Sequence, residues 1–285
     1  MAKAVRCLKP SQSEFQKLFS TLCYSRSNWQ VWSDFIAMSA IAISNVFDRE
    51  GPNHDEREKQ YMELSRSYTK NEVDILARLL SIVVLALEDN PRQDFLGEVF
   101  QGLGLNSHWK GQFFTPYHIC EFMAEITLGN AEAEIRKKGW IGVNDPACGA
   151  GALLIAARNA MEKRGLPRTG ALFVAQDIDR TAALMCYIQL ALLGCAGYVI
   201  IGDSLLHPPT GHPLCLDPSP ELDVWYLPMF YEQAWHYRRV WHSLNTVLRS
   251  ERCPAAPKEL PQPQRVVVMP APAFSETAAG QLTLF

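Results

Sequence analysis

A glycine-rich turn between two apolar segments carries the first residues that could do chemistry. The short run at 140–144 leads into DPACGAG, Asp145 to Gly151, and then directly into the helical pattern of 152–164. Such a turn lets a ligand approach the backbone and presents free N–H groups at the helix N-terminus. Nucleotide and flavin sites use similar turns. The carboxylate of Asp145 would repel a pyrophosphate, however, and favours a ligand with a positive or hydroxyl donor.

Two more acidic residues stand where the next two apolar runs end. AQDID places Asp177 after the run at 171–175, and GDSL places Asp203 after the run at 198–201. In open α/β sheets ligands bind beyond the carboxyl ends of the strands, so three carboxylates there would form one rim. Asp177 is placed to hold ribose hydroxyls and Asp203 to accept from an adenine amino group. Helix capping is the alternative role for each one alone. Three in succession favour a ligand site.

A parallel sheet is needed to bring these residues together, and the pattern of residues 106–250 predicts one. Short apolar runs alternate there with amphipathic helices, which is typical of an α/β fold with a parallel, Rossmann-like sheet. Residues 1–105 show helical spacing and loop-like breaks, and they predict an α-helical domain. Residues 251–285 are rich in proline and predict an extended tail. Within the tail, RVVVM at 265–269 is either a strand at a sheet edge or part of the extended chain.

Bulk composition excludes several classes of protein. The chain has 285 residues, a net charge of −3 and 48% hydrophobic residues, so it is an ordinary folded protein without a global basic signal. A local basic face is still compatible with that charge. Its eight cysteines are scattered and show no metal-ligand spacing. The uncharged run at 181–202 is divided by glycines and reads as a buried helix and strand rather than a membrane span. We expect a cytoplasmic protein with no bound metal and no membrane segment.

Four motifs in a fixed order give the sequence a specific resemblance. GQFFTP at 111–116, DPACGAG at 145–151, AQDID at 175–179 and GDSL at 202–205 resemble those of the adenine-specific DNA methyltransferases. The group most similar to them is the modification subunit of type I restriction–modification systems, and DFLGEVFQGLGL at 94–105 also fits that group. The resemblance covers residues 94–230, about half of the chain.

The resemblance implies S-adenosylmethionine as cofactor and DNA as substrate. Phe114 and Thr115 would hold the methionine end of the cofactor and Asp145 its amino group. Asp177 would bind the ribose and Asp203 the adenine. The full set of implied cofactor-binding residues is Phe114, Thr115, Pro116, Asp145, Pro146, Cys148, Gly149, Gly151, Asp177, Ile178, Asp203 and Ser204.

The implied catalytic motif departs from the family pattern. The family flips its target adenine out of the duplex. It then holds the exocyclic amine with an Asn or Asp side chain and a proline carbonyl, while an aromatic ring stacks on the base. Here that segment reads Leu227-Pro228-Met229-Phe230. Phe230 can stack and the carbonyl of Pro228 can accept, but the side chain of Leu227 cannot. Losing such a group costs about 3–4 kcal/mol, or roughly 10²–10³ in rate. HPPT at 207–210 is expected to be loop.

Two functions from different classes therefore stay open. The chain is either an active or partner-dependent adenine methyltransferase, or a cofactor-binding relic that acts by binding DNA or a partner. Residues after 250 offer neither further sheet strands nor a recognition region, so sequence specificity is expected to be absent or supplied by another subunit. A small-molecule methyltransferase is disfavoured, because GQFFTP after a helical domain belongs to the DNA-modifying group. If the C-terminal residues dock onto the sliding clamp, as considered next, the protein works near replicating DNA, as expected of a phage or mobile-element product.

Two segments suggest partners. The helix expected at 231–248 carries Tyr237, Arg238, Arg239 and Trp241, which could meet nucleic acid by charge and stacking. The alternative is an amphipathic helix that covers the sheet. The chain ends in GQLTLF, and Gln281, Leu282, Leu284 and Phe285 resemble the short peptide by which bacterial replication proteins dock onto the sliding clamp. Apolar anchors that fill a surface pocket, oriented by one polar side chain, would explain such docking.

Overall fold

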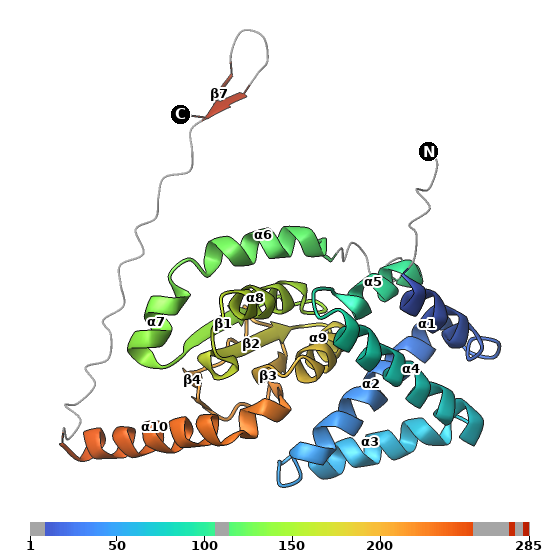
Figure 1. The fold of residues 1–285 in the computed structure, drawn as a ribbon, viewed down its shortest axis with the longest axis horizontal. Helices are drawn as coiled ribbons and strands as arrows, with labels where there is room; N and C mark the ends of the chain where they lie inside the picture. Colours follow the sequence, from blue (N-terminus) through green and yellow to red (C-terminus); the bar gives the residue numbers. More distant parts are fainter. Residues whose placement is uncertain (1–8, 106–113, 253–273, 277–281, 285) are drawn as a thin grey trace. The chain divides into compact units, whose positions relative to one another are not determined.

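The computed structural model describes residues 9–105, 114–252, 274–276 and 282–284. Figure 1 shows a small sheet with helices on both faces. The N-terminal part is helical, as the sequence predicts. Its helices are α1 (Pro10–Ser20), α2 (Asn28–Phe47), α3 (His54–Arg66), α4 (Lys70–Asp89) and α5 (Phe95–Gly102).

Local capping explains where these N-terminal helices begin. The side chain of Ser27 accepts the backbone N–H of Gln30 at the start of α2. Thr69 and Glu72 form a capping box at the start of α4, each side chain bonding the other residue's backbone. These bonds satisfy N–H groups that have no partner within the helix. An aromatic cluster around Phe15 and Trp32 then fills the space between the helices.

The α/β part begins after residue 113 and alternates as predicted. Its helices are α6 (Tyr117–Thr127), α7 (Ala131–Lys138), α8 (Ala152–Lys163), α9 (Arg180–Leu192) and α10 (Gln233–Arg252). Its sheet contains β1 (Ile141–Asp145), β2 (Ala171–Asp177), β3 (Ala196–Ile201) and β6 (Asp223–Tyr226), in the order β1-β2-β3-β6. The uncharged run at 181–202 forms α9 and β3. None of the helices within the described ranges is long and apolar enough to cross a membrane.

The direction of the last strand corrects the sequence prediction. β1, β2 and β3 are parallel, but β6 runs antiparallel to β3, with Tyr198 opposite Tyr226 and Ile201 opposite Asp223. A parallel neighbour needs a long crossover, usually a helix. The connection from β3 to β6 holds only a small hairpin of β4 (Gly211–His212) and β5 (Cys215–Leu216). The chain therefore turns back, and β6 ends where β3 begins.

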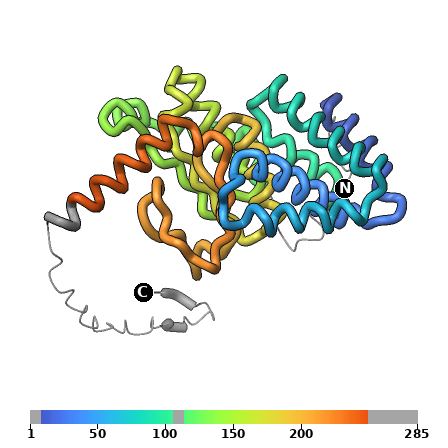
Figure 2. The backbone as a smooth tube through the Cα atoms, turned by 90° about the horizontal axis from the view of Figure 1, so that it is seen from below, coloured from blue at the N-terminus to red at the C-terminus, as the bar shows by residue number. Residues whose placement is uncertain are grey.

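One hydrophobic core joins the N-terminal helices to the sheet. It runs from the aromatic residues of α1 and α2 through α9, which is buried along almost its whole length, to one face of β1–β3. Figure 2 shows the N-terminal helices grouped beside the α/β layers. Described residues up to Ser243 form one compact unit. The predicted domain boundary near residue 105 stays a prediction, and what the structure shows is a shared core.

A second, smaller core covers the opposite face of the sheet. It contains Leu172, Tyr198 and Ile200 from the strands, and Phe230 and Trp235 from the segment after β6. The indole of Trp235 is fully buried and packs edge-on against Trp140, with ring centroids 5.8 Å apart. The start of α10 thus closes this face. The second compact unit, Leu244–Phe285, contains the rest of α10 and a hairpin of β7 (Phe274–Glu276) and β8 (Leu282–Leu284).

Candidate cofactor site

The glycine turn after β1 needs its glycines for both conformation and space. Gly149 has φ of 54° and Gly151 has φ of 94°, in the left-handed region that residues with a Cβ avoid. A Cβ on Gly151 would lie 2.8 Å from the sulfur of Cys186. A Cβ on Gly149 would lie 3.0 Å from the ring of Phe114. The turn therefore brings bare backbone to the edge of the sheet, where α8 begins.

Asp177, at the end of β2, holds this turn in place. One of its carboxylate oxygens accepts the N–H of Gly149 at 2.8 Å, and the other accepts the N–H of Asp179 at 2.9 Å. Its backbone carbonyl accepts the N–H of Gly202 at 3.0 Å, which fastens the end of β3. A carboxylate has about four acceptor positions, so these bonds leave capacity for hydroxyl donors of a ligand.

Asp145 is the residue on this rim most suited to a cation. Burial raises the pKa of its carboxyl group, and the negative charge of Asp177 raises it further, against one hydrogen bond from the N–H of Ala147 that lowers it. Two carboxylates at adjacent strand ends repel each other, so an ammonium or sulfonium group between them would relieve that cost. This is the ligand class that the sequence predicts for Asp145.

Asp203 behaves differently from the other two carboxylates. It accepts the N–H groups of Leu205 and Leu206 at 2.8 and 3.1 Å, and these bonds lower the pKa of its carboxyl group. It therefore holds the turn at 204–206, and it does not cap a helix, which was the alternative role considered for it. Ser204 beside it is half-buried. Ile178, immediately after β2, is 71% exposed and offers an apolar side chain next to Asp177.

Of the predicted residues before α6, Phe114 reaches the glycine turn. Phe114 lies against Gly149, and its ring centroid is 5.5 Å from that of Phe100 in α5. Thr115 and Pro116 are exposed, and Pro116 stands immediately before α6. The first three residues of GQFFTP lie outside the described residues. Within the turn itself, Pro146 is exposed, and Cys148 is buried with its N–H donated to the carbonyl of Gln176 at 2.9 Å.

Sequence reasoning missed a buried polar connection behind the turn. The amide of Gln189 in α9 donates to the carboxylate of Asp94 at 2.8 Å and to the carbonyl of Ala150 at 2.9 Å. Its oxygen accepts the N–H of Leu96 at 3.1 Å. Gln189 thus ties the glycine turn to the start of α5. A single glutamine in an otherwise apolar helix was the available signal.

Asp94 gives this connection a pH dependence. Burial raises the pKa of its carboxyl group to about 6, from an ordinary value of 3.8. The folded state therefore holds this proton more tightly than the unfolded chain does, and its contribution to stability is lost as pH rises from about 4 through 6. Over this pH range we expect the free energy of unfolding of the wild-type protein to fall by on the order of 2–3 kcal/mol. Asp94→Asn should abolish this fall, because its amide does not titrate and its oxygen can still accept both hydrogen bonds. Urea unfolding of both proteins at pH 4 and pH 7.5 measures it. Equal pH dependence in both would contradict this role.

The Leu227-Pro228-Met229-Phe230 segment lies away from the rim. The N–H of Leu227 donates to the carbonyl of Gly197 at 2.9 Å, at the amino end of β3, whereas the rim lies at the carboxyl ends. Leu227 is fully buried in the main core. Pro228 begins a short 3-10 helix, and Phe230 stacks on Tyr226 with centroids 4.9 Å apart. The structure does not bring Leu227, Pro228 and Phe230 together with the predicted cofactor-binding residues, because β6 runs antiparallel to β3.

This placement predicts the outcome of restoring the family's side chain. Leu227→Asn would put an amide into an apolar core without a partner and lose about 2–4 kcal/mol of stability. It would not create methyl transfer, because position 227 lies beside the amino end of β3 and the predicted cofactor site lies at the carboxyl ends of the strands. Denaturant unfolding and a DNA methylation assay measure the two effects. A stable variant that gains activity would contradict the placement of β6. Leu227→Met, which keeps the apolar volume, is the matched control.

Arg238 and Arg239 of α10 are engaged with the protein itself. Arg238 donates to the carbonyls of Thr169 and Gly139, and its guanidinium lies 4.3 Å from the ring centroid of Trp235. Arg239 donates to the carbonyl of Phe230 and lies 4.1 Å from that ring's centroid. These contacts favour the interpretation of α10 as a helix that covers the sheet.

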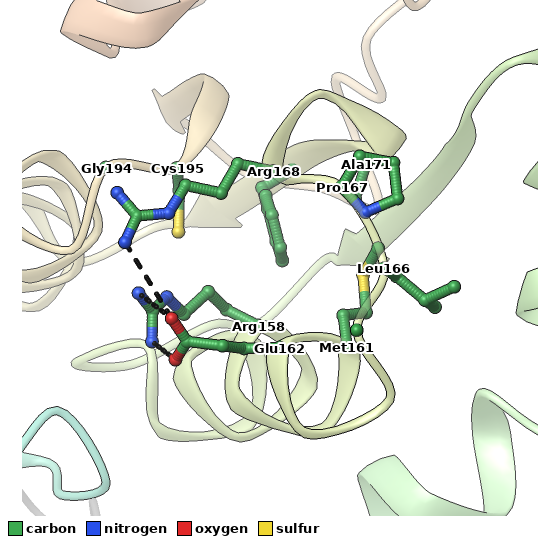
Figure 3. A pocket seen from close by; sticks show the side chains of 11 residues that line it. Arg158, Met161, Glu162, Leu166, Pro167, Arg168, Ala171, Gly194 and Cys195 are labelled. Carbon is green, nitrogen blue, oxygen red and sulfur yellow. Dashed lines mark hydrogen bonds and ion pairs between the residues drawn. The ribbon is translucent and has the colours of Figure 1, made fainter.

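Two further features lie elsewhere. A cavity of 230 Å³ opens between the end of α8 and the starts of β2 and β3, at the edge opposite the glycine turn, with Arg158, Glu162 and Arg168 on one side (Figure 3). It is separate from the cofactor rim.

Of the predicted clamp-binding residues, Gln281 and Phe285 lie outside the described residues. Leu282 and Leu284 belong to β8.

Comparison with known proteins decides the family. The sequence profile of the N-6 DNA methylases matches residues 93–238, just over half of the chain. The chain belongs to the N-6 DNA methylase family. Family membership implies S-adenosylmethionine as its cofactor, and the family modifies DNA. Membership of the type I modification subunits stays a prediction.

Two other comparisons complete these findings. A search of the curated proteins finds no match to the sequence. Among solved structures, the chain is similar to a Listeria monocytogenes protein assigned to the class I S-adenosylmethionine-dependent methyltransferases. The two are 17% identical, with a TM-score of 0.36, over 80% of this chain and 70% of the other.

Proposed function

We propose that this N-6 DNA methylase binds S-adenosylmethionine at the carboxyl ends of β1–β3 and transfers its methyl group to the exocyclic amine of adenine only together with a second subunit. The observation that carries this proposal is that two groups of residues lie at opposite ends of the strands of one sheet. The turn of Gly149 and Gly151 and the carboxylates of Asp145 and Asp177 are assembled at one edge. The segment expected to hold the base ends at the other edge.

The residues of the rim have distinct roles in this proposal. Asp145 binds the ammonium group of the cofactor, which relieves its repulsion with Asp177. Asp177 keeps the N–H of Gly149 in place and accepts the ribose hydroxyls. Ile178, exposed beside the rim, packs on the adenine ring of the cofactor. Phe114 closes the methionine side above the glycine turn.

The second subunit supplies what the rim lacks. S-adenosylmethionine provides an electrophilic methyl group. The accepting amine loses a proton as the new carbon–nitrogen bond forms, so an acceptor must lie beside it when that charge develops. In the family that acceptor is an Asn or Asp side chain, and Leu227 stands in its place at the opposite edge. Sequence recognition of DNA would come from the same partner.

Methyl transfer by the chain alone tests this proposal. Purified full-length chain is incubated with methyl-labelled S-adenosylmethionine and unmethylated duplex DNA that contains every short adenine context, and 6-methyladenine is measured by mass spectrometry. We expect bound cofactor and no 6-methyladenine. Product formed by the chain alone would overturn partner dependence. Failure to retain the cofactor would overturn the site itself.

A cofactor-binding protein without catalytic activity is the second candidate, and the same contrast favours it. Co-purification from the native host separates the two functions. A complex that methylates adenine supports the two-subunit enzyme. A complex that contains cofactor and DNA but yields no product supports the binding module.

We propose separately that the C-terminal peptide docks onto the bacterial sliding clamp. Only the sequence of Gln281–Phe285 supports this. Removing these five residues is expected to abolish binding to purified clamp in surface plasmon resonance, because the apolar anchors and the orienting glutamine are lost together. Unchanged affinity would end this proposal.

A further inference from the structure

β1 is an edge strand that pairs along one side. Among the described residues it pairs with β2 through consecutive partners, and no strand pairs with its other side. The backbone N–H and C=O groups along such an edge are a template for an added strand, and proteins usually protect an edge with lysine, proline or a bulge. β1 reads Ile-Gly-Val-Asn-Asp, without lysine or proline, and its register with β2 is unbroken. This edge is therefore open to pairing.

A cavity lies along the unpaired side of β1. It has a volume of 310 Å³ and lies between β1 and the helices α6, α7 and α8. Four consecutive residues of β1, Ile141 to Asn144, line it. Because successive side chains of a strand point to opposite faces, a cavity that contacts all four must reach the edge of the strand. No residue of β2 lines it, so this edge is the unpaired one.

The lining of the cavity favours apolar side chains at alternate positions of an added strand. Ile141 and Val143 pack against the main core, whereas Gly142 and Asn144 are exposed. A neighbouring strand follows the same alternation, so every second side chain would enter the cavity and the others would face solvent. The apolar residues that would surround the inserted side chains are Ala124, Leu128, Ala131, Leu153, Leu154 and Ala157.

Charge distinguishes a protein segment from nucleic acid at this surface. Of the described residues that line the cavity, Glu134 alone carries a charge, and it pairs with Lys138 at 2.7 Å. Glu125 of α6 is also paired, with Lys163 and Arg164. Phosphate groups would need cations that the cavity does not present. A neutral segment with alternate apolar side chains matches the cavity in both charge and polarity.

α6 extends the apolar surface beyond the cavity. Ile119, Phe122, Met123 and Ile126 lie on one side of this helix and are between 42% and 66% exposed. Together they expose on the order of 300–400 Å², if each large apolar side chain has about 150–200 Å². Thr127 lines the cavity and donates to the carbonyl of Met123, so the two surfaces adjoin. A contiguous apolar patch of this size marks an interaction site and gives a folded partner a surface to cover.

We infer that an extended segment of another protein adds to β1 as a further strand of the sheet and places its alternate apolar side chains in the cavity. In strand addition the backbone supplies affinity and the pocket supplies selectivity. A segment parallel to β1 would end beside Asp145, at the rim where the proposed function needs a second subunit. Identifying the partner with that subunit rests on the proposed function, whereas the strand addition itself does not.

A model strand peptide tests the inference on the full chain, without cofactor or DNA. The probe is fluorescein-labelled Lys-Val-Thr-Ile-Thr-Val-Lys amide, which alternates apolar and polar side chains. We expect saturable binding in fluorescence anisotropy, and slower amide hydrogen exchange in Ile141–Asp145 when the peptide is bound. The same peptide with N-methylated central residues keeps its side chains but cannot donate backbone hydrogen bonds, and it should not bind.

A matched pair of variants tests the role of the cavity. Thr127→Trp is expected to weaken peptide binding by about tenfold or more, since the indole would exclude one apolar side chain of the peptide from the cavity. His118→Trp places the same ring at an exposed position of α6 outside the cavity lining, and its affinity should equal that of the wild type. Circular dichroism confirms that both variants are folded.

Three results would overturn the inference. One is the absence of saturable binding up to about 1 mM peptide. Another is equal binding of the N-methylated peptide or unchanged amide exchange in β1, because apolar docking without strand pairing would then explain the affinity. The third is a folded Thr127→Trp protein that binds as tightly as the wild type. Peptide binding as expected, in a protein that retains no S-adenosylmethionine, would count against the proposed function alone.

Discussion

We expect the Gly197→Ala protein to lose most of the free energy that stabilises its folded sheet. Gly197 has φ of 141°, and a Cβ there would lie 1.8 Å from the carbonyl oxygen of Phe173 on β2. No side-chain movement can relieve a clash with backbone. The carbonyl of Gly197 also accepts the N–H of Leu227, so any shift of β3 breaks its pairing with β6. We expect a destabilisation above about 4 kcal/mol, which is exceptional for one methyl group.

Denaturant unfolding measures this effect, and a matched control is available in the same sheet. Gly142 lies in β1, and a Cβ there would meet nothing within 4 Å. Gly142→Ala should therefore change stability by about 0.5 kcal/mol or less. Two variants with equal stability would contradict the pairing of Phe173 with Gly197. The contrast tests the strand register without reference to function.

Asp177→Ala is expected to weaken binding of S-adenosylmethionine by about 100-fold or more. The substitution removes the acceptor that we propose for the ribose hydroxyls, and hydrogen bonds to a charged group contribute about 1.5–3 kcal/mol each. It also releases the N–H groups of Gly149 and Asp179, so the glycine turn loses its anchor. Fluorescence or calorimetric titration measures the affinity.

A control of equal charge accompanies this variant. Asp55 in α3 has a fully exposed side chain, and Asp55→Ala removes one carboxylate far from the rim. The affinity of the Asp55→Ala protein for S-adenosylmethionine should equal that of the wild type. Asp177→Ala must also be shown to be folded, by its near-ultraviolet circular dichroism. Wild-type affinity in a folded Asp177→Ala protein would show that the ligand does not use the end of β2.

The features that sequence predicted well are local in the chain. A glycine turn that follows an apolar run, and an aspartate at the end of the next run, are separated by one helix and meet because parallel strands align their ends. The pairing of Asp145 with Ala175 and of Asp177 with Ile201 is the register that this alignment requires. Short-range pattern therefore sufficed for β1, α8, β2, α9 and β3.

The direction of β6 could not be predicted in the same way. The run at 222–227 indicates a strand, but an apolar run carries no information about which edge it joins or which way it points. The length and content of the connection decide that. Here the connection from β3 to β6 lacks a helix, and a buried guanidinium holds β6 in its antiparallel position. Arg57 of α3 donates to the carboxylate of Asp223 at 3.1 Å and lies 3.8 Å from the ring centroid of Trp225.

Long-range polar contacts were also invisible in the sequence. Gln189 joins Asp94, Leu96 and Ala150, which lie far from it along the chain. Arg238 suggested nucleic acid because its charge was visible and its backbone partners were not. A polar residue inside an apolar helix indicates that a partner exists, but only the fold identifies that partner.

Calorimetric titration of the full chain with S-adenosylmethionine tests the central claim most directly. The account predicts one site per chain. It also predicts that Asp145→Ala removes the binding while the protein stays folded, because we propose that this carboxylate binds the ammonium group of the cofactor. Asp203→Ala should weaken binding less, because Asp203 already holds its own turn. A folded wild-type chain that binds no cofactor, or an Asp145→Ala variant that binds as tightly as the wild type, would contradict the account.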